Sequence, residues 1–566
     1  MSPIPFRTLP EALAAAPPRR PFVTMWNDED DVQTVTFGEF HHRVRAQAAH
    51  FQSLGLRRGD PVIVIMPQGI PLMTAFVAAM LLGAVPAILA YPNFKVEPTK
   101  YRSGLAGVSA NLKARLVIVD DAFPSELLEH VAVHDSVHLV RGVSDDSSET
   151  RVALADALPS DSESLAFIQH SAGTTGLQKG VALSHAAVLR QLSHLATALR
   201  INDQDRIYSW LPLYHDMGLI ACFMLPLVYH LPVVMQSPTN WVIQPATMLE
   251  LISQYGCTLA WAPNFALQFL ARRVRPEDRA NYDLSSLRAL INSSEPVLAQ
   301  SMDEFLTAFG SCGIQPNVLQ SSYGTAENVL AVTQSGIHGE PGPGRLWVDG
   351  ARLRNEHKAV SVEKAAEGAV PLVSSGPCLP GNLVRIVSPD GQDLPDGTIG
   401  EILICSDSLF DGYYNRPDRT KEALKDGWFW SGDLGFCLDR ELYVTGRKKD
   451  LIIVGGKNIY PQDVEEIACS HPAIHDGRAV AVGILNTNLG TEDIVVVAEV
   501  EEEGSLRDAF DIEQAVRIVI VAELGVAVRA VYLKRPKWIV KSTAGKPARS
   551  ATREKLLAEH PELVQG

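Results

Sequence analysis

The sequence has few cysteines, and their spacing gives no sign of a disulfide framework. Its 566 residues include seven cysteines, an odd number, and no two of them are spaced Cys-x-x-Cys. This pattern argues against a zinc site and for reduced thiols in a cytoplasm. Residues 1–5 also lack a basic region followed by an apolar segment, so we expect no signal peptide and a cytoplasmic protein.

Membrane-length apolar runs are also scarce. One stretch, residues 71–91, is about as long as a membrane span, but Gly83 and Pro86 interrupt it, and a buried helix followed by a strand explains it better. We therefore expect no integral membrane segment. The net charge of −15 disfavours nucleic acid as a partner.

The sequence does contain material for large buried cores. A chain of 566 residues, 46% hydrophobic and 20% charged, is typical of a globular protein with at least two domains. Between residues 20 and 160, short apolar runs alternate with amphipathic stretches. Strands are expected at 61–66, 87–90 and 116–119 and a helix at 71–82, which is the rhythm of an α/β fold.

A loop rich in glycine, serine and threonine occupies residues 169–181. It lies between an expected strand at 165–168 and Ser184, which has the position of a helix N-cap. Amides and hydroxyls in such a loop can surround phosphate oxygens, and the basic side chain at its end adds positive charge. Gln178 and Gly180 exclude a Walker A motif. A nucleotide-phosphate site is predicted, with an ordinary surface turn as the alternative, and its candidate residues are Ser171, Gly173, Thr174, Thr175, Gly176 and Lys179.

This loop resembles the phosphate loop of the adenylate-forming (ANL) superfamily, which includes acyl-CoA synthetases, peptide-synthetase adenylation domains, luciferases and fatty acyl-AMP ligases. The resemblance covers residues 20–555, because further motifs follow in the family's order. It implies an α/β protein with a large N-terminal AMP-binding and acyl-binding domain, residues 1–448, built from mixed sheets packed with helices and a small β-barrel-like subdomain. It also implies a small mobile α+β C-terminal domain, residues 449–566, that carries the catalytic lysine.

Three stretches resemble the acid-binding side of the family. Residues 210–219, with Tyr-His-Asp-Met-Gly, nearly match the corresponding sequence motif of the fatty acyl-AMP ligases. This resemblance implies that His215 lies beside the acyl and ATP sites. Residues 261–266 and 292–296 match further segments, the second with two serines where the family has Gly-Ala. The added hydroxyls suggest a shorter or functionalised acid. The implied acyl-pocket residues are Met217, Phe265 and Ser293, and the residues implied against the adenosine are Ser294 and Glu295.

The nucleotide side is represented by four further motifs. In residues 321–327, Tyr323 is implied as the adenine contact and Glu327 as the magnesium ligand, with Gly324 and Thr325 between them. Ala326 occupies the family's usual threonine position. The other implied roles are ribose binding for Asp433, ribose and phosphate binding for Arg447, the hinge for Lys449 and catalysis for Lys546.

Two charged stretches have open interpretations. A helix after residue 263 is expected to carry Arg272, Arg273, Arg275 and Arg279, either as a solvated face or as a docking site for an acidic protein. Residues 334–368 coincide with the insertion that distinguishes fatty acyl-AMP ligases from acyl-CoA synthetases. By implication it restrains the C-terminal domain and disfavours CoA; the alternative is a tolerated surface loop.

The resemblance implies that the protein uses ATP and Mg²⁺ to convert a fatty or related carboxylic acid to acyl-AMP, releasing pyrophosphate. The acyl group would then pass to the phosphopantetheine of an acyl carrier protein, for polyketide or related lipid assembly. The alternative acceptor is CoA, as in an acyl-CoA synthetase. A non-catalytic nucleotide-binding scaffold is the third possibility.

Overall fold

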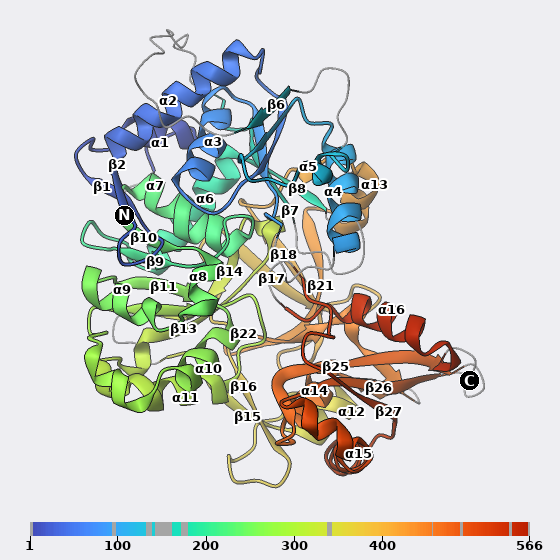
Figure 1. Ribbon diagram of the computed structural model, residues 1–566. Helices are drawn as coiled ribbons and strands as arrows, with labels where there is room; N and C mark the ends of the chain where they lie inside the picture. Colours follow the sequence, from blue (N-terminus) through green and yellow to red (C-terminus); the bar gives the residue numbers. More distant parts are fainter. Residues whose placement is uncertain are drawn as a thin grey trace.

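The chain folds into a large N-terminal body and a smaller C-terminal domain, which confirms the expected α/β architecture (Figure 1). The two parts meet at a short 3₁₀ helix, η6 (Lys448–Asp450), which follows the last strand of the large body. No helix of the described residues is long and apolar enough to cross a membrane. The computed structural model describes residues 4–92, 98–131, 138–141, 161–170, 179–336, 342–454, 457–486, 491–542 and 546–563.

An eight-stranded sheet forms the centre of the large body. Its strands, in spatial order, are β14 (Ala331–Gln334), β13 (Leu319–Gly324), β12 (Ala289–Asn292), β11 (Leu259–Ala262), β9 (Ile207–Ser209), β10 (Val233–Gln236), β1 (Pro21–Trp26) and β2 (Val32–Thr36). Neighbours from β13 to β1 are parallel, and the edge strands β14 and β2 pair antiparallel. All residues of β9 to β12 are buried, as expected of parallel strands covered on both faces.

A second, parallel sheet confirms the strands and the helix expected in the first 160 residues. Its order is β4 (Val85–Ile88), β3 (Pro61–Ile65), β5 (Leu116–Val119) and β6 (His138–Arg141). The predicted helix is α3 (Ile70–Leu81), almost wholly buried, so the membrane-length stretch is a core helix followed by a strand. The other helices of this region are α1 (Leu9–Ala14), α2 (Phe37–Ser53), α4 (Pro98–Leu112) and α5 (Ser125–Leu128).

The elements that flank the predicted phosphate loop also form as expected. Strand β7 (Leu165–His170) precedes it, and β8 (Gly180–Ser184) follows it and pairs with β7 and β19 (Gly412–Tyr413). Ser184 is the N-cap of α6 (His185–Ala198), and its side chain accepts a hydrogen bond from the amide of Ala187. The loop is therefore bounded by a three-stranded sheet and leads into a capped helix.

The expectation of one helix carrying all four arginines is wrong. Helix α10 (Asn264–Arg273) ends at Arg273. Pro276 supplies the reason, because the residue before a proline is pushed out of the helical region, and Arg275 has φ −62° and ψ 142°. Arg275 and Arg279 belong instead to the segment around a 3₁₀ helix, η2 (Pro276–Asn281). The other helices here are α7 (Leu225–Tyr229), α8 (Pro238–Ile243), α9 (Thr247–Tyr255) and α11 (Ala299–Phe309).

Residues 342–368 contain a strand and a helix rather than loop alone. Strand β15 (Arg345–Asp349) pairs antiparallel with β16 (Ala369–Val373), and α12 (Gly350–Glu356) begins directly after β15, capped by Asp349. An antiparallel sheet follows, made of β17 (Asn382–Val387), β18 (Gly400–Ser406), β20 (Leu424–Lys425), β21 (Trp428–Leu438) and β22 (Glu441–Arg447), with α13 (Pro417–Ala423) beside it.

The C-terminal domain has its own apolar core, which is the mark of a separate domain. Strands β25 (Ile474–Asn486), β26 (Thr491–Val500) and β27 (Val528–Lys534) form its sheet, beside a hairpin of β23 (Ile452–Val454) and β24 (Lys457–Ile459). Its helices are α14 (Pro461–Cys469), α15 (Ala509–Leu524) and α16 (Arg549–Glu559). Figure 1 shows this domain, orange to red, beside the lower end of the large body.

Candidate active site

Four predicted motifs follow neighbouring parallel strands of the eight-stranded sheet. They are residues 210–217 after β9, residues 263–266 after β11, residues 293–296 after β12 and residues 323–327 at the end of β13. Carboxyl ends of parallel strands share one edge of a sheet, where ligands bind in open α/β sheets. Contacts join the motifs there: the amide of Phe265 donates to Oε2 of Glu295 (3.1 Å), and Oγ of Ser294 donates to Sδ of Met217 (3.9 Å).

A buried carboxylate, Asp433, marks the predicted ribose position. The hydroxyl of Tyr323 donates to its Oδ2 (2.8 Å), and Nε of Arg447 lies 3.1 Å from its Oδ1. Asp433 and Arg447 lie opposite each other in the pairing of β21 with β22. Burial raises the pKa of Asp433, and Arg447 and the Tyr323 hydroxyl oppose that rise. The carboxylate is therefore fixed in orientation, with lone pairs left for further donors.

A second carboxylate, Glu327, is 92% buried in the turn after β13. The hydroxyl of Thr325 donates to its Oε2, and the hydroxyl of Tyr413 donates to its Oε1 (2.7 Å). Thr325 thus gives a hydroxyl contact although Ala326 occupies the usual threonine position. Gly324 is required at this turn, because a Cβ there would collide with the carbonyl oxygen of Leu330.

His215 and Asp216 form a pair beside Met217. Nδ1 of His215 lies 2.7 Å from Oδ1 of Asp216, which also accepts from the amide of Met217 (2.7 Å). Burial alone would raise the pKa of the Asp216 carboxyl, but His215 and the Met217 amide bring it below its ordinary value. A carboxylate only accepts, so Nδ1 of His215 carries a proton and Nε2 is left for another partner.

Lys546 reaches this site from the C-terminal domain. Its Nζ donates to the carbonyl oxygen of Ser294, which directly follows Ser293 at the end of β12. Ser294 has φ 71°, a left-handed conformation that non-glycine residues rarely adopt and that is often found at functional sites. Burial lowers the pKa of Lys546, and Glu295 and Asp216 oppose that shift. The small domain therefore places an ammonium group at the strand edge of the large one.

The two serines use their hydroxyls differently from the expectation. Oγ of Ser293 donates to the carbonyl oxygen of Ser322 on the neighbouring strand (2.9 Å), so this hydroxyl stabilises the sheet edge instead of facing a substrate. Oγ of Ser294 makes only the long contact to the thioether of Met217 among the described residues. Of the two serines that were expected to select a functionalised acid, only Ser294 therefore keeps a hydroxyl that the acid could contact.

Stacked aromatic rings lie next to Phe265. The rings of Trp210 and Trp241 are 3.7 Å apart and nearly parallel, at 6°. The ring of Phe265 packs with its edge toward both, at 6.2 and 6.1 Å, and 38% of Phe265 is exposed. The predicted acyl-pocket residue is thus the accessible member of an aromatic cluster, whose inner members are buried.

The remaining predicted residues fall into two groups. Ser171, Gly173, Thr174, Thr175 and Gly176 lie outside the described residues. Lys179 is described, and its Nζ lies 3.5 Å from the hydroxyl of Tyr413 and 4.4 Å from the centre of that ring. Lys449 lies in η6, and burial lowers its pKa, with Arg447 adding to the effect.

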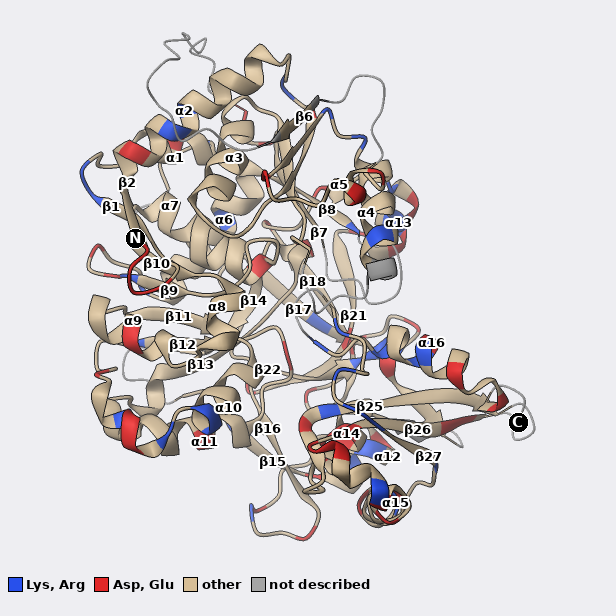
Figure 2. Ribbon diagram, in the orientation of Figure 1, with Lys and Arg blue, Asp and Glu red and all other residues tan. Residues whose placement is uncertain are grey.

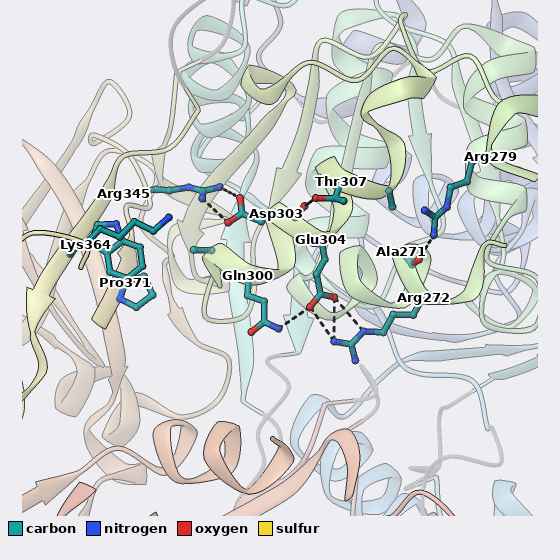
Figure 3. A pocket seen from close by; sticks show the side chains of 13 residues that line it. Ala271, Arg272, Arg279, Gln300, Asp303, Glu304, Thr307, Arg345, Lys364 and Pro371 are labelled. Atoms are coloured by element: carbon teal, nitrogen blue, oxygen red, sulfur yellow. Dashed lines mark hydrogen bonds and ion pairs between the residues drawn. The ribbon is translucent and has the colours of Figure 1, made fainter. Parts of the chain in front are cut away.

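A groove of about 720 Å³ lies away from these residues, between α10, α11 and the β15–β16 hairpin (Figure 3). Its arginines are mostly paired: Arg345 forms a two-pronged ion pair with Asp303 (2.6 and 2.9 Å), and Arg272 contacts Glu304 (3.2 Å) and Asp476 of the C-terminal domain. Figure 2 likewise shows basic and acidic residues intermixed on α10 and α11. The arginine-rich stretch is therefore partly neutralised: Arg272 and Arg275 pair with carboxylates, whereas Arg279 donates to backbone carbonyl oxygens.

The fold is that of an α/β protein with a large N-terminal and a smaller C-terminal domain. The model of the family described as AMP-binding enzyme matches residues 10–414. A medium-chain-fatty-acid–[acyl-carrier-protein] ligase of Moorena producens is 32% identical over 95% of this chain and 92% of its own length. A long-chain-fatty-acid–AMP ligase of Mycolicibacterium smegmatis is 30% identical over 94% and 90%.

A solved structure from a study of fatty acyl-adenylate ligases of E. coli and L. pneumophila agrees with a TM-score of 0.90. Its sequence is 29% identical, and the match covers 99% of both chains. The chain therefore belongs to the AMP-binding enzyme family, within the adenylate-forming superfamily. Its enzyme class is that of the adenylate-forming ligases, which use ATP.

Two residues that contact the predicted site were missing from the predicted set. Asp216 stands inside the Tyr-His-Asp-Met-Gly motif, so an acceptor next to His215 could have been found from the sequence. Tyr413 had no such signal, because its contacts Lys179 and Glu327 are 234 and 86 residues away along the chain.

Proposed function

We propose that this protein activates a fatty or related carboxylic acid with ATP and transfers the acyl group to an acyl carrier protein. The first half-reaction gives acyl-AMP and pyrophosphate, and in the second the phosphopantetheine thiol of the carrier displaces AMP. The observation that carries the proposal is the position of Lys546, whose ammonium group reaches the strand edge beside Ser294. The names of the two relatives, a ligase to acyl carrier protein and an AMP ligase, support the same reaction.

In the first half-reaction, a carboxylate oxygen of the acid attacks the α-phosphorus of ATP. The bond from that phosphorus to the bridging oxygen breaks, and pyrophosphate leaves with the electron pair. Such a transfer needs positioning and charge neutralisation more than covalent help. Lys546 would lie between the carboxylate and the α-phosphate oxygens, where negative charge accumulates.

The large domain would hold the nucleotide and the acid. Tyr323 offers a ring to the adenine, Asp433 accepts from the ribose hydroxyls with Arg447 beside it, and Lys179 contacts the β- and γ-phosphates with the loop at 171–176. His215 would orient the acid through Nε2, since Asp216 holds its other ring nitrogen. These roles follow from the chemistry of each group and from the contacts that join Asp433 to Tyr323 and Arg447.

Glu327 fits a magnesium ion that accompanies ATP. Each of its carboxylate oxygens accepts one hydrogen bond, from Thr325 or Tyr413, and keeps lone pairs for a hard cation. Within the described part of the chain, no group of three or more potential metal ligands is found. Glu327 alone can therefore hold the magnesium ion only if phosphate oxygens of ATP complete the coordination of the ion, as is usual for Mg²⁺. When bound, the ion would neutralise phosphate charge.

The acid would enter along Phe265 and Met217. Phe265 is the exposed member of the aromatic cluster, and behind it the stacked Trp210 and Trp241 are at least 95% buried. Rings packed this closely leave no room for a chain between them. We therefore favour an acid of limited length in this direction, with the Ser294 hydroxyl available to a substituent.

The insertion supports the carrier protein over CoA as acceptor. Val348 and Leu353 of residues 334–368 pack in one apolar cluster with Tyr460, which belongs to the C-terminal domain. Helix α12 also contacts β24 of that domain. By holding the small domain in place, the insertion would limit its movement into the domain arrangement that transfer to free CoA needs.

The acceptor can be tested by mass spectrometry. The protein is incubated with ATP, magnesium and a panel of carboxylic acids, and then CoA or a phosphopantetheinylated carrier protein is added. Thioester on the carrier alone is the expected result. Efficient acyl-CoA formation by the wild type would favour an acyl-CoA synthetase instead.

A point variant isolates the insertion without deleting it. Leu353→Asp places a charge in the cluster with Tyr460, and acyl-CoA formation should then rise relative to the wild type. Leu383→Asp is the matched control, because that leucine is 61% exposed on β17. Equal acceptor preference in both variants would contradict a restraining role. Release of pyrophosphate by the purified wild type separates either enzyme from a non-catalytic scaffold.

A further inference from the structure

Tyr413 stands between the two charged residues that are proposed to meet the phosphates and the metal. It lies on β19, which pairs antiparallel with β8 so that Tyr413 is opposite Val181, just after Lys179. On the other side, the amide of Phe410 donates to the carbonyl oxygen of Glu327 (2.8 Å). Backbone hydrogen bonds therefore fix the segment 410–413 to both places.

The Tyr413 side chain joins the two charges through one oxygen. Its hydroxyl donates to Oε1 of Glu327 (2.7 Å) and accepts from Nζ of Lys179 (3.5 Å), which also lies 4.4 Å above the ring. The Lys179 ammonium group and the Glu327 carboxylate, both among the residues that the structure describes, form no direct ion pair with each other. The phenol thus occupies the place where a lysine–carboxylate pair would otherwise close.

The ring is held as firmly as the hydroxyl. Tyr413 is 96% buried, and the rings of Phe410 and Tyr413 are 5.0 Å apart with an edge-to-face angle of 64°. Burial and the neighbouring Glu327 charge raise the pKa of Tyr413 well above its ordinary value, so the hydroxyl stays protonated and donates. The ring contact and the two polar contacts of the hydroxyl therefore fix the position of the side chain.

We propose that Tyr413 is a positioning residue, which orients Glu327 toward a magnesium ion and keeps Lys179 free to contact the phosphates of ATP. This inference rests on the proposed function. Without the hydroxyl, the lysine and the carboxylate are free to pair with each other, which withdraws both from the ligand. A residue that orients a metal ligand typically changes metal affinity or activity 10- to 100-fold when it is lost.

The test is a binding measurement, made without any acid so that no reaction occurs. Affinity for ATP is measured by calorimetry over a series of Mg²⁺ concentrations for the wild type, Tyr413→Phe and Tyr414→Phe. Phenylalanine keeps the ring that packs on Phe410 and Lys179 and removes only the hydroxyl. Tyr414 is the matched control, since its hydroxyl has no hydrogen bond to another described residue.

For Tyr413→Phe we expect the Mg²⁺ concentration that gives half-maximal tightening of ATP binding to rise by about 10- to 100-fold. Tyr414→Phe should match the wild type. If Tyr413→Phe also matches the wild type, the positioning role is overturned and the proposed function still stands. A wild type that binds no ATP at any magnesium concentration overturns the proposed function itself.

A double-mutant cycle separates positioning from a general structural role. In a Glu327→Gln background, Tyr413→Phe should have little further effect on the magnesium dependence, because the group it orients is gone. Equal, additive effects in both backgrounds would overturn the inference. Thermal unfolding of each variant shows whether the fold is retained, and the cycle remains informative even if stability falls.

Discussion

The two sides of the active site differ in how firmly they are held. On the large domain, Asp433 is contacted by Tyr323 and Arg447, and Glu327 by two hydroxyls. On the small domain, the Nζ of Lys546 donates to a single acceptor among the described residues, the carbonyl oxygen of Ser294. The groups proposed to hold the nucleotide are thus fixed by contacts within the large domain, whereas the lysine comes from a separate domain.

This difference suits an enzyme with two half-reactions. A preorganised nucleotide side can keep AMP in place, while the domain that delivers Lys546 can leave once the adenylate has formed. Domain movements of this kind often govern turnover. We therefore expect substitutions in the large domain to affect mainly nucleotide binding, and substitution of Lys546 to affect mainly the rate of adenylate formation.

The largest effect is expected from Lys546→Ala. Loss of one preorganised charge at the site of developing negative charge should slow acyl-adenylate formation about 10²- to 10³-fold. ATP affinity in the absence of acid should stay within threefold, because the large domain holds the nucleotide. Single-turnover adenylate formation and equilibrium ATP binding measure the two quantities.

Lys537→Ala is the control for that variant, since Lys537 is an exposed lysine of the same domain. It should leave both quantities unchanged. An adenylation rate of Lys546→Ala within threefold of the wild type would remove Lys546 from its role.

Asp433→Ala should mainly weaken ATP binding, whereas Lys546→Ala should mainly slow adenylate formation. Hydrogen bonds to a charged group are worth about 1.5–3 kcal/mol, so ATP affinity should fall about 10- to 100-fold. Calorimetric titration with ATP checks this. Asp393→Ala is the control, because that aspartate lies on the surface paired with Arg385. Unchanged ATP affinity in Asp433→Ala would contradict the ribose assignment.

The pH dependence of adenylation should also depend on Lys546. Burial lowers the pKa of Lys546, and only its protonated form carries the charge that adenylation needs. Adenylation kcat/KM, which reports the free enzyme, should therefore fall with rising pH before the ordinary lysine pKa of about 10.4 is reached. Lys546→Arg keeps its charge, so its alkaline decline should move to higher pH. Superimposable alkaline limbs for the two proteins would rule out Lys546 as the titrating group.

The smallest effect is expected from Arg272→Ala, which removes an ion pair between the domains. Arg272 joins Glu304 of the large body to Asp476 of the small domain, and these side chains are partly exposed. Exposed ion pairs contribute about 0.2–1 kcal/mol, so both half-reaction rates should change less than about fivefold and the difference should vanish at high salt. Arg275→Ala is the matched control, since its carboxylate contacts, Glu277 and Asp278, lie in its own segment. A larger loss for Arg272→Ala would mean that the small domain is held by this pair.

Much of the proposed site could be inferred from the sequence because the residues of each motif lie close together along the chain. Tyr323 and Glu327 follow one strand, Ser294 and Glu295 another, and the strands themselves follow from buried apolar runs. In the structure, parallel strands place these motifs at one sheet edge, a meeting point that the sequence analysis did not predict. The error in α10 was avoidable on the same local grounds, since Pro276 ends the helical path.

Contacts between distant segments could not be read in this way. The Ser293 hydroxyl looked free for a substrate, but the adjacent strand takes it through the carbonyl oxygen of Ser322. The arginines near residue 275 looked like a basic face, and carboxylates from α11 and from the small domain neutralise part of it. In each case the partner belongs to another strand, helix or domain, which a single stretch of sequence does not specify.

Residue type, spacing and local burial pattern were enough to indicate the family, the α/β fold and the chemical groups of the proposed site. The orientation of those groups depends on tertiary contacts. Tyr413 meets Lys179 and Glu327 because β19 pairs with β8 and lies against the turn after β13. Lys546 reaches Ser294 because a separately folded domain packs on the sheet edge. Both contacts depend on packing between segments far apart along the chain, and no local pattern encodes it.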